Sequence, residues 1–212
     1  MPRIIVGTTG SVAAVRVPDL CLTLIAAGHH VEVVATEPSL HFYSPAELPP
    51  GTPLHRDDDE WPVALYARGD EVLHIELRRR ADVLVLAPLD ANTLGKLALG
   101  LCDNLLTCLF RAWDPARPVV LAPAMNTLMW DKPVTARHLG RIWSDVTGRE
   151  PPADWSLATA EAHFAREAPT VVLVPPQSKR LACGDVGDGA MADVAVVAEA
   201  VRAWAERSSP AA

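Results

Sequence analysis

Short apolar runs recur along the chain, separated by longer segments with apolar residues at helical spacing. The runs cover 4–6, 31–34, 83–87, 119–122 and 171–174. A strand that is buried on both faces shows an unbroken Val, Ile and Leu run, so each run predicts a strand of a parallel sheet. Helical spacing predicts helices over 12–27, 92–111, 126–143 and 194–207. This alternation is typical of an open, doubly wound α/β fold, Rossmann-like or flavodoxin-like, with helices on both faces of the sheet.

Two stretches interrupt the alternation. Residues 45–70 are Pro-rich and carry the acidic run 57–60, which predicts a loop or a mostly irregular excursion. Residues 144–169 are polar and broken by prolines, with one possible helix over 158–167. We expect a single domain over 1–207 that accommodates both stretches, followed by a frayed tail over 208–212.

Composition narrows the class of protein. Of the 212 residues, 50% are hydrophobic and 21% are charged, which excludes a disordered chain. The net charge of −7 argues against an electrostatic nucleic-acid binder, although helix N-termini can still bind a small anion. No run approaches the roughly 20 apolar residues that span a bilayer, and the N-terminus predicts a strand rather than a signal peptide. We therefore expect a cytoplasmic protein with reduced cysteines, no membrane contact and, for lack of a ligand pattern, no metal.

The carboxyl ends of three predicted strands carry candidate binding residues. The first strand leads into Gly7-Thr8-Thr9-Gly10-Ser11, which either receives a phosphate or is a tight turn with Ser11 as N-cap. The third and fourth strands both end in Ala-Pro, and Asn92 and Asn126 follow. Each Asn alone is best explained as a helix cap. Two such ends beside a phosphate-type turn favour a planar polar ligand across the strand edge, such as a nucleotide or a flavin.

Among the side chains that can react, Cys183 is the strongest candidate. It lies in a Gly-rich segment, 181–192, that predicts a mobile flap or tight loop, where a thiol can act as acid, base or nucleophile. Cys21 and Cys108 lie in apolar helical patterns and Cys102 in a predicted helix, so we expect all three to be structural. His74, taken alone, is more readily explained as structural or solvated than as catalytic.

Several of these segments together resemble the flavin-dependent cysteine decarboxylases, a family of flavoproteins. The matching blocks are 10–14, 36–45, 72–139 and 179–192. The most specific are Pro-Ala-Met-Asn at 123–126 and Ala-Cys-Gly-Asp-x-Gly-x-Gly-Ala-Met at 182–191. The resemblance covers nearly the whole chain apart from a gap after Arg141.

The resemblance implies noncovalently bound FMN at the strand edge. It assigns the cofactor to Gly10, Ser11, Val12, Thr36, Ser39, Phe42, Asp90, Ala91, Asn92, Thr93 and Ala124. It makes His74 the catalytic base, Asn126 the residue that grips the substrate carboxylate, and Cys183 the proton donor. Arg180, Leu181, Ala182 and Met191 are assigned to substrate binding.

The implied reaction is decarboxylation of the cysteine moiety of phosphopantothenoylcysteine to 4′-phosphopantetheine, in coenzyme A biosynthesis. It proceeds through oxidation to a thioaldehyde, loss of CO2 and re-reduction of the enethiol. The resemblance also implies a homotrimer or dodecamer with sites at subunit interfaces. Two alternatives stay open: an oxidative decarboxylase of a peptide C-terminal cysteine, and a non-catalytic FMN-binding regulatory module. The stretch 144–169 is longer than the family leads us to expect, and Asp193 stands where the family usually has Glu.

Overall fold

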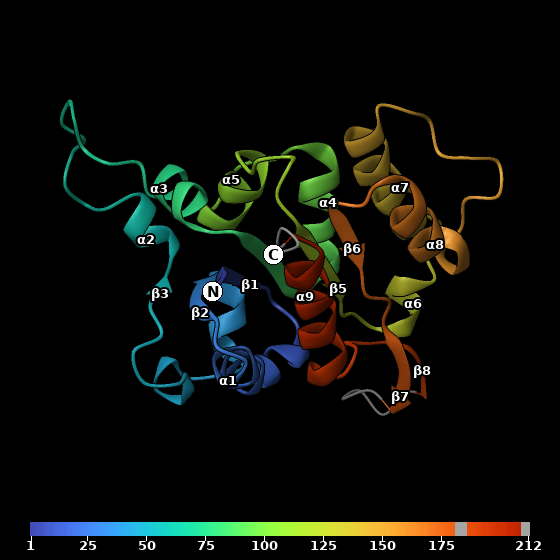
Figure 1. The fold of residues 1–212 in the computed structure, drawn as a ribbon, viewed down its shortest axis with the longest axis horizontal. Coiled ribbons are helices and arrows are strands. Elements are labelled where there is room, and N and C mark those ends of the chain that lie inside the picture. Colours follow the sequence, from blue (N-terminus) through green and yellow to red (C-terminus); the bar gives the residue numbers. More distant parts are fainter. Residues whose placement is uncertain (181–185, 209–212) are drawn as a thin grey trace.

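The computed structural model describes residues 1–180 and 186–208, and its centre is a six-stranded parallel sheet (Figure 1). The strand order is β3-β2-β1-β4-β5-β6, and every neighbouring pair is parallel. The strands are β1 (Arg3–Thr8), β2 (His30–Ala35), β3 (Leu54–His55), β4 (Val83–Leu89), β5 (Val119–Pro123) and β6 (Val171–Leu173). The chain builds outward from β1 to β3 and then crosses back to β4. This reversal makes the β1/β4 boundary the topological switch point of the sheet.

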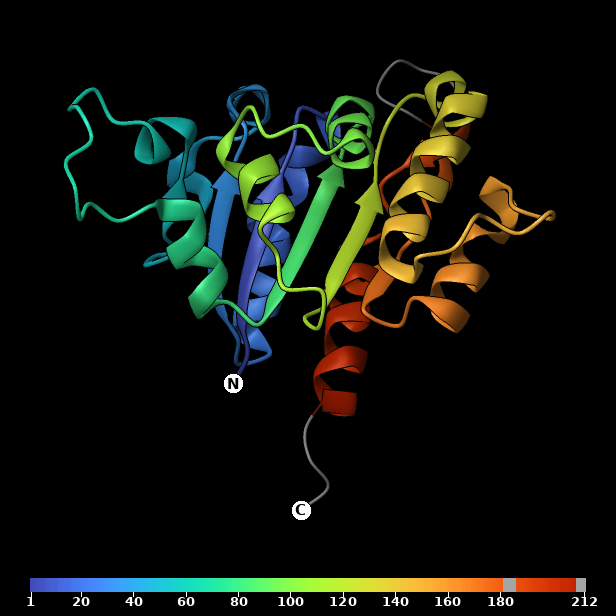
Figure 2. The same cartoon turned by 90° about the horizontal axis from the view of Figure 1, so that it is seen from above.

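Helices cover both faces of the sheet, as the sequence predicts (Figures 1 and 2). One face carries α3 (Leu73–Arg80), α4 (Ala91–Leu99), α5 (Leu105–Arg111) and α7 (Pro133–Thr147). The other face carries α1 (Val17–Ala26) and α9 (Val194–Ser208). The remaining α-helices are α2 (Asp57–Glu60), α6 (Thr127–Trp130) and α8 (Leu157–Glu167). No helix in the described ranges is long and apolar enough to cross a membrane.

Two buried apolar clusters fix the sheet between its helix layers. Successive strand residues point to opposite faces, so Ile5 packs with the cluster under α5 and α7, while Ile4 and Val6 pack with the cluster under α1 and α9. Every residue of β4 and β5 is buried. This explains why these strands appear in the sequence as unbroken apolar runs.

Several predicted helices are divided in the structure. The predicted helix over 92–111 is α4 and α5, because Gly100 adopts a left-handed conformation (φ 69°) that ends α4. The predicted helix over 126–143 is α6 and α7, with α7 extending to Thr147. Residues 12–27 form a 3-10 helix, η1 (Val12–Arg16), followed by α1. The predictions placed helices in these segments but missed the breaks within them.

The two interrupting stretches contain more regular structure than predicted. The stretch 45–70 holds the 3-10 helix η3 (Pro45–Glu47), β3 and α2, and its longest part without a helix or strand begins at residue 61 and runs on to residue 72. The second stretch begins with the end of α7 and contains α8, which starts within one residue of the predicted position.

The prediction for Cys102 is wrong, because it lies between α4 and α5 and is exposed. Cys108 lies in α5 but is only partly buried, so it is not a core thiol. Cys21 is buried in the α1 cluster as predicted, and burial raises the pKa of its thiol to about 12. Cys183 and the tail residues 209–212 lie outside the described residues.

Sequence patterns also missed an antiparallel hairpin of β7 (Gln177–Arg180) and β8 (Val186–Ala190). The hairpin lies against the end of β5, where the Met125 N–H donates to the Gly189 carbonyl at 2.9 Å. Gly189 has φ +157°, and a Cβ there would collide with the Met125 carbonyl oxygen. A glycine is therefore required for this close approach.

Candidate functional site

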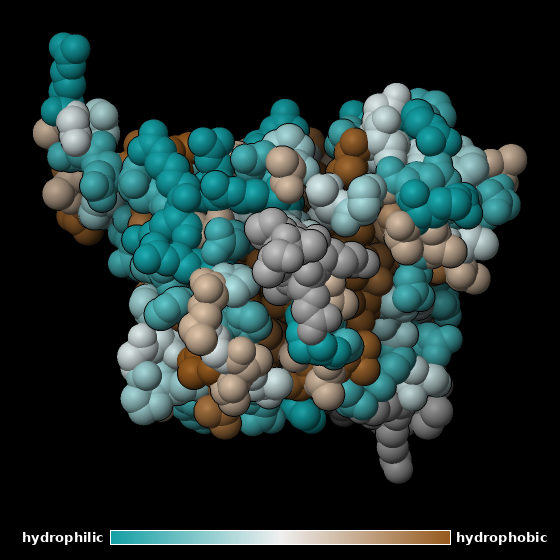
Figure 3. Space-filling model, in the orientation of Figure 1, coloured by the Kyte–Doolittle hydropathy of each residue, from teal (hydrophilic) through white to brown (hydrophobic). Residues whose placement is uncertain are grey.

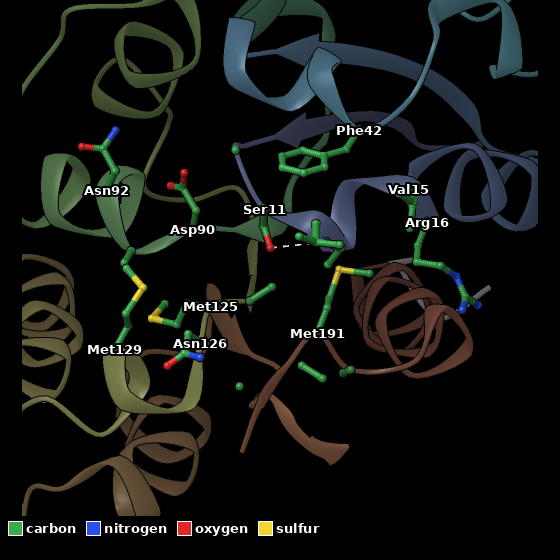
Figure 4. A pocket seen from close by; sticks show the side chains of 18 of the residues that line it. Ser11, Val15, Arg16, Phe42, Asp90, Asn92, Met125, Asn126, Met129 and Met191 are labelled. Atoms are coloured by element: carbon green, nitrogen blue, oxygen red, sulfur yellow. Dashed lines mark hydrogen bonds between the residues drawn. The ribbon is translucent and has the colours of Figure 1, made fainter. Parts of the chain in front are cut away.

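A cavity of about 630 Å³ opens at the carboxyl ends of β1, β4 and β5 (Figure 4). It lies at the β1/β4 switch point, where ligands of open α/β sheets bind. Most of its lining is apolar, with a few polar side chains, and its volume is within the range of small-molecule sites. The cavity brings together ten of the predicted site residues: Gly10, Ser11, Val12, Phe42, Asp90, Ala91, Asn92, Ala124, Asn126 and Met191.

The turn after β1 forms one wall. A Cβ on Gly10 would lie 2.8 Å from the Pro38 Cβ and 3.3 Å from Asp90 Oδ2, so the backbone there passes closer than a side chain allows. The Ser11 hydroxyl caps η1 by accepting the Ala13 N–H at a long 3.4 Å (Figure 4). A hydroxyl and backbone N–H groups at the start of a helix can bind an anion without a basic side chain.

The loop after β4 is fixed by hydrogen bonds to the β1 turn. Buried Thr9 Oγ1 donates to the Pro88 carbonyl at 2.8 Å and accepts the Asp90 N–H at 2.7 Å. Asp90 Oδ1 in turn caps α4 by accepting the Thr93 N–H at 2.7 Å. These bonds hold Asp90, Ala91 and Asn92 at the cavity wall.

The third wall follows β5. Asn126 is the N-cap of α6, and its Oδ1 accepts the Leu128 N–H at 2.9 Å. Because Oδ1 is held by the helix backbone, the orientation of the whole amide group is fixed beside the cavity. Asn126 therefore does serve as a cap, as its pattern indicates, but from a position where it also faces the ligand space.

Aromatic, thioether and charged side chains complete the lining. Figure 4 shows Phe42 on one side of the cavity and Asn126 and Met191 on the other. Sequence reasoning missed Arg16 and Met129, which also line it. Met129 lies three residues after Asn126 on α6, so helical spacing could have indicated it. Arg16 is an exposed cation that pairs with Asp19 at 3.4 Å.

Three predicted cofactor residues are buried behind the wall rather than in it. The Thr36 hydroxyl donates to the Thr8 carbonyl at 3.2 Å, and the Ser39 hydroxyl donates to the Thr36 carbonyl at 2.7 Å. Thr93 is 2% exposed and its N–H is held by Asp90. The hydroxyls of Thr36 and Ser39 thus stabilise the backbone that supports the cavity.

His74 lies outside the cavity of its own chain. It is in the first turn of α3, and its Nδ1 is 2.6 Å from Glu60 Oε1. The cavity lining does not include His74, so one chain does not bring the predicted base together with Asn126.

The predicted flap is only partly described. Cys183, Leu181 and Ala182 lie outside the described residues, as does the side chain of Arg180. The base of the hairpin is held by Gln177, whose Nε2 donates to the Met191 carbonyl at 2.8 Å and to Asp193 Oδ1 at 3.2 Å. Asp193 thus contacts the hairpin from the start of α9.

The lining suits a planar, phosphate-bearing cofactor. Of the residues that line the cavity, the Gly10 turn and Ser11 would hold a phosphate, Phe42 and the methionines would give apolar contacts, and Asp90, Asn92 and Asn126 would meet the polar edges of a ring. FMN has these features. Among the described residues, no group of three or more His, Cys, Asp or Glu side chains is arranged to hold a metal ion.

Comparisons with known proteins identify the family of the chain. A rice phosphopantothenoylcysteine decarboxylase is 47% identical over 206 residues, covering 97% of this chain and 82% of the relative. A solved structure of a PPC decarboxylase mutant complexed with pantothenoylaminoethenethiol is 45% identical, with a TM-score of 0.80 and coverage of 97% and 98%. The FMN binding protein AtHal3 is also 45% identical, with a TM-score of 0.79 and coverage of 98% of both chains. The Flavoprotein family matches residues 1–206, and the chain belongs to this family.

Proposed function

We propose that this protein catalyses the FMN-dependent decarboxylation of phosphopantothenoylcysteine to 4′-phosphopantetheine. The observation that carries the proposal is the cavity at the switch point, which joins the Gly10 turn, Phe42 and Asn126 in one site. Relatives that match nearly the whole chain bear the name of this activity.

FMN held in the cavity would supply a reversible two-electron acceptor: the cysteine thiol would be oxidised to a thioaldehyde, which makes loss of the neighbouring carboxylate as CO2 favourable, and the same two electrons would return to the enethiol as a hydride. The chain supplies the remaining functions. Asn126 donates from its fixed amide to the substrate carboxylate and orients the C–C bond that breaks. His74 accepts the proton of the thiol, because a neutral imidazole is a suitable base near pH 7. Cys183 protonates the carbon after CO2 has left.

The mass of the product tests the reaction. Incubation with phosphopantothenoylcysteine is expected to give a product that has lost only CO2, whereas oxidative decarboxylation gives a product lighter by two further hydrogens. Cys183→Ser is expected to convert the first outcome into the second, with the yellow FMN absorbance retained. A colourless protein, or turnover of a Cys-terminal peptide and not of the small substrate, would contradict the proposal.

We further propose a homotrimer, or a higher assembly of trimers, in which His74 of one copy reaches the cavity of the next. Two observations support it: His74 is not at its own cavity, and the cavity mouth exposes Val12, Val15 and Met129, each about half exposed. A repeated head-to-tail contact closes into a ring of three when each copy is rotated by one third of a turn from the last.

Complementation tests the shared site. His74→Asn and Asn126→Ala are each expected to be inactive, yet co-expressed together they form interfaces that pair one intact His74 with one intact Asn126. Random mixing gives about one quarter of such interfaces, and we expect about that fraction of the wild-type rate. If the mixture stays inactive although mixed assemblies form, the shared site is wrong.

A further inference from the structure

The acidic run 57–60 forms hydrogen bonds that fix its own position and place Glu60 beside His74. It forms the single turn α2, in which Asp57 Oδ1 accepts the Leu105 N–H at 2.8 Å and Asp59 Oδ2 accepts the Arg56 N–H at 2.8 Å. The first bond ties α2 to the N-terminus of α5, and the second closes the turn. Both leave the last residue of the run, Glu60, directed at α3.

Glu60 binds His74 through both carboxylate oxygens. Oε1 lies 2.6 Å from the ring Nδ1, and Oε2 accepts the His74 backbone N–H at 2.8 Å. The Glu60 side chain is only 5% exposed, whereas that of His74 is 22% exposed. His74 is therefore anchored at its ring Nδ1 and at its backbone N–H, while part of its side chain stays accessible to solvent.

This contact dictates which nitrogen of the neutral imidazole carries the hydrogen. An ionised carboxylate only accepts hydrogen bonds, so a 2.6 Å contact requires the proton on Nδ1. The lone pair is then on Nε2, which has no hydrogen-bond partner within the part of the chain that the structure describes. A lone pair without a partner in its own chain is what a base needs to accept a proton from a substrate.

The Cys108 thiol, which also lies near Glu60, does not supply a second charge beside the carboxylate. Burial, the neighbouring Cys102 and the Glu60 carboxylate together raise the pKa of the Cys108 thiol to about 11. Cys108 thus remains uncharged at neutral pH, and Glu60 has His74 as its ionisable hydrogen-bond partner.

We propose that Glu60 is a positioning residue, which fixes His74 as the Nδ1–H tautomer and presents Nε2 as the base. The inference rests on the proposed function only in the role it gives to His74, because the tautomer itself can be observed without any reaction. It also gives the stretch 45–70 a role, because α2 carries the Glu60 carboxylate 14 residues before the His74 imidazole that it orients.

The test compares Glu60→Gln with Asp58→Asn. Both remove one negative charge from α2, but Asp58 is exposed and makes no hydrogen bond among the described side chains. Nitrogen-15 NMR of the FMN-loaded protein, with His74 assigned by His74→Gln, reports the tautomer directly. We expect wild type and Asp58→Asn to show the Nδ1–H form, and Glu60→Gln to show a mixture, because an amide can donate as well as accept.

Kinetics gives the second measurement. Glu60→Gln is expected to lower kcat by about 10- to 100-fold with KM and FMN absorbance unchanged, as for loss of an interaction that acts on the base alone. An unchanged tautomer and an unchanged kcat in Glu60→Gln would overturn the proposal. If Glu60→Gln changes the tautomer but the wild-type protein does not decarboxylate the substrate, the positioning role is upheld and the proposed function is rejected. If Glu60→Gln fails to fold, Glu60→Asp serves instead: it keeps the charge, and a retained tautomer with a smaller loss of kcat is the supporting result.

Discussion

The two stretches that interrupt the βα pattern each contain a segment without a strand, and these two segments differ in how they pack: one is held against the body of the protein and the other projects from it. Residues 148–168, with α8, fold onto the sheet edge: Trp155 Nε1 donates to the Ala136 carbonyl at 2.9 Å, and its ring stacks on His163 at 5.6 Å. Residues 61–72 project from the body between α2 and α3 (Figures 1 and 3). Their Val63, Leu65 and Tyr66 are 104%, 95% and 70% exposed. We call this projecting segment, 61–72, the arm.

Spacing and caps, rather than apolar content, account for the difference. In α8, Ala160 and Phe164 lie one turn apart on one face, and Ser156 and Thr159 form a capping box that starts the helix. Both apolar residues are fully buried. The arm also has apolar residues, but they are not spaced to form one face of a helix and no capping residue starts one. They therefore stay exposed in the single chain. The arm lies beside His74, which is where the trimer proposed above would bring two copies together.

The largest effect is expected from Trp143→Ala, in the well-packed region. The Trp143 side chain is fully buried, lies 5.7 Å from the Trp155 ring and donates to the His163 carbonyl at 3.3 Å. Its removal leaves a cavity and should lower the free energy of unfolding by about 3–5 kcal/mol in urea titrations. Trp61→Ala is the control, because Trp61 lies in the arm and is half exposed. It should change the free energy of unfolding by less than about 0.5 kcal/mol. Equal losses in the two variants would show that the arm is packed as tightly as α8.

Gly140→Ala is expected to have an intermediate effect. Gly140 is inside α7, where alanine alone would stabilise the helix by about 1 kcal/mol. A Cβ there would lie 3.0 Å from Trp155 Nε1 and 3.3 Å from Pro151 Cγ, so it forces the packed loop away from α7. We expect the steric overlap to outweigh the gain in helix propensity, so that the free energy of unfolding falls by about 1–2 kcal/mol in thermal and urea unfolding. A gain in stability would mean that the 148–156 loop yields easily.

Much of the fold could be predicted because its signals are local. Apolar runs identified β1, β2, β4, β5 and β6, and helical spacing identified the helices that cover them. β3 was missed because it has only two residues, and β7 and β8 because their polar, Gly-rich sequences show no apolar pattern. The hairpin depends instead on a backbone approach to Met125, which is distant in sequence.

The site could be predicted as far as it follows strand ends. Gly10, Asp90 and Asn126 each follow the end of a parallel strand within three residues, and parallel strand ends share one edge. Thr36 and Ser39 also follow a strand, but the direction of a hydroxyl within a turn is not a sequence property. The pairing of Glu60 with His74 was out of reach, since it joins residues on either side of the arm.

A smaller, pH-dependent effect on the free energy of unfolding is expected from Glu32 of β2, which lies beside the edge strand β3. Hydrogen bonding to His55 of β3, then to Arg80 of α3, holds the pKa of Glu32 below its usual value of 4.5, against the opposing effect of burial. A carboxyl with a lowered folded-state pKa contributes stability above its unfolded pKa, and this contribution is lost as the pH falls through the folded pKa.

Glu32→Gln should therefore cost less than about 1 kcal/mol at pH 7, and the difference from wild type should vanish as the pH drops below 4.5. Unfolding titrations between pH 3 and pH 7 measure it, with exposed Glu37→Gln as the control. A difference that stays constant over this pH range would show that the Glu32 charge does not hold β3 to the sheet.

The smallest effect on the single chain is expected from the arm itself. Leu65→Ser combined with Tyr66→Ser removes apolar groups that are already exposed, so the free energy of unfolding of dilute, monomeric protein should change by less than about 0.5 kcal/mol. The same change should weaken association, because these side chains would lose the surface of a neighbouring copy. Sedimentation velocity over a concentration series measures the assembly, and Phe164→Ser is the contrasting variant, which should unfold the chain rather than dissociate it. A double variant that is destabilised as a monomer would place the arm in the core of its own chain. One that assembles like wild type would remove it from the interface, and the contrast with α8 would then reflect only a solvated loop.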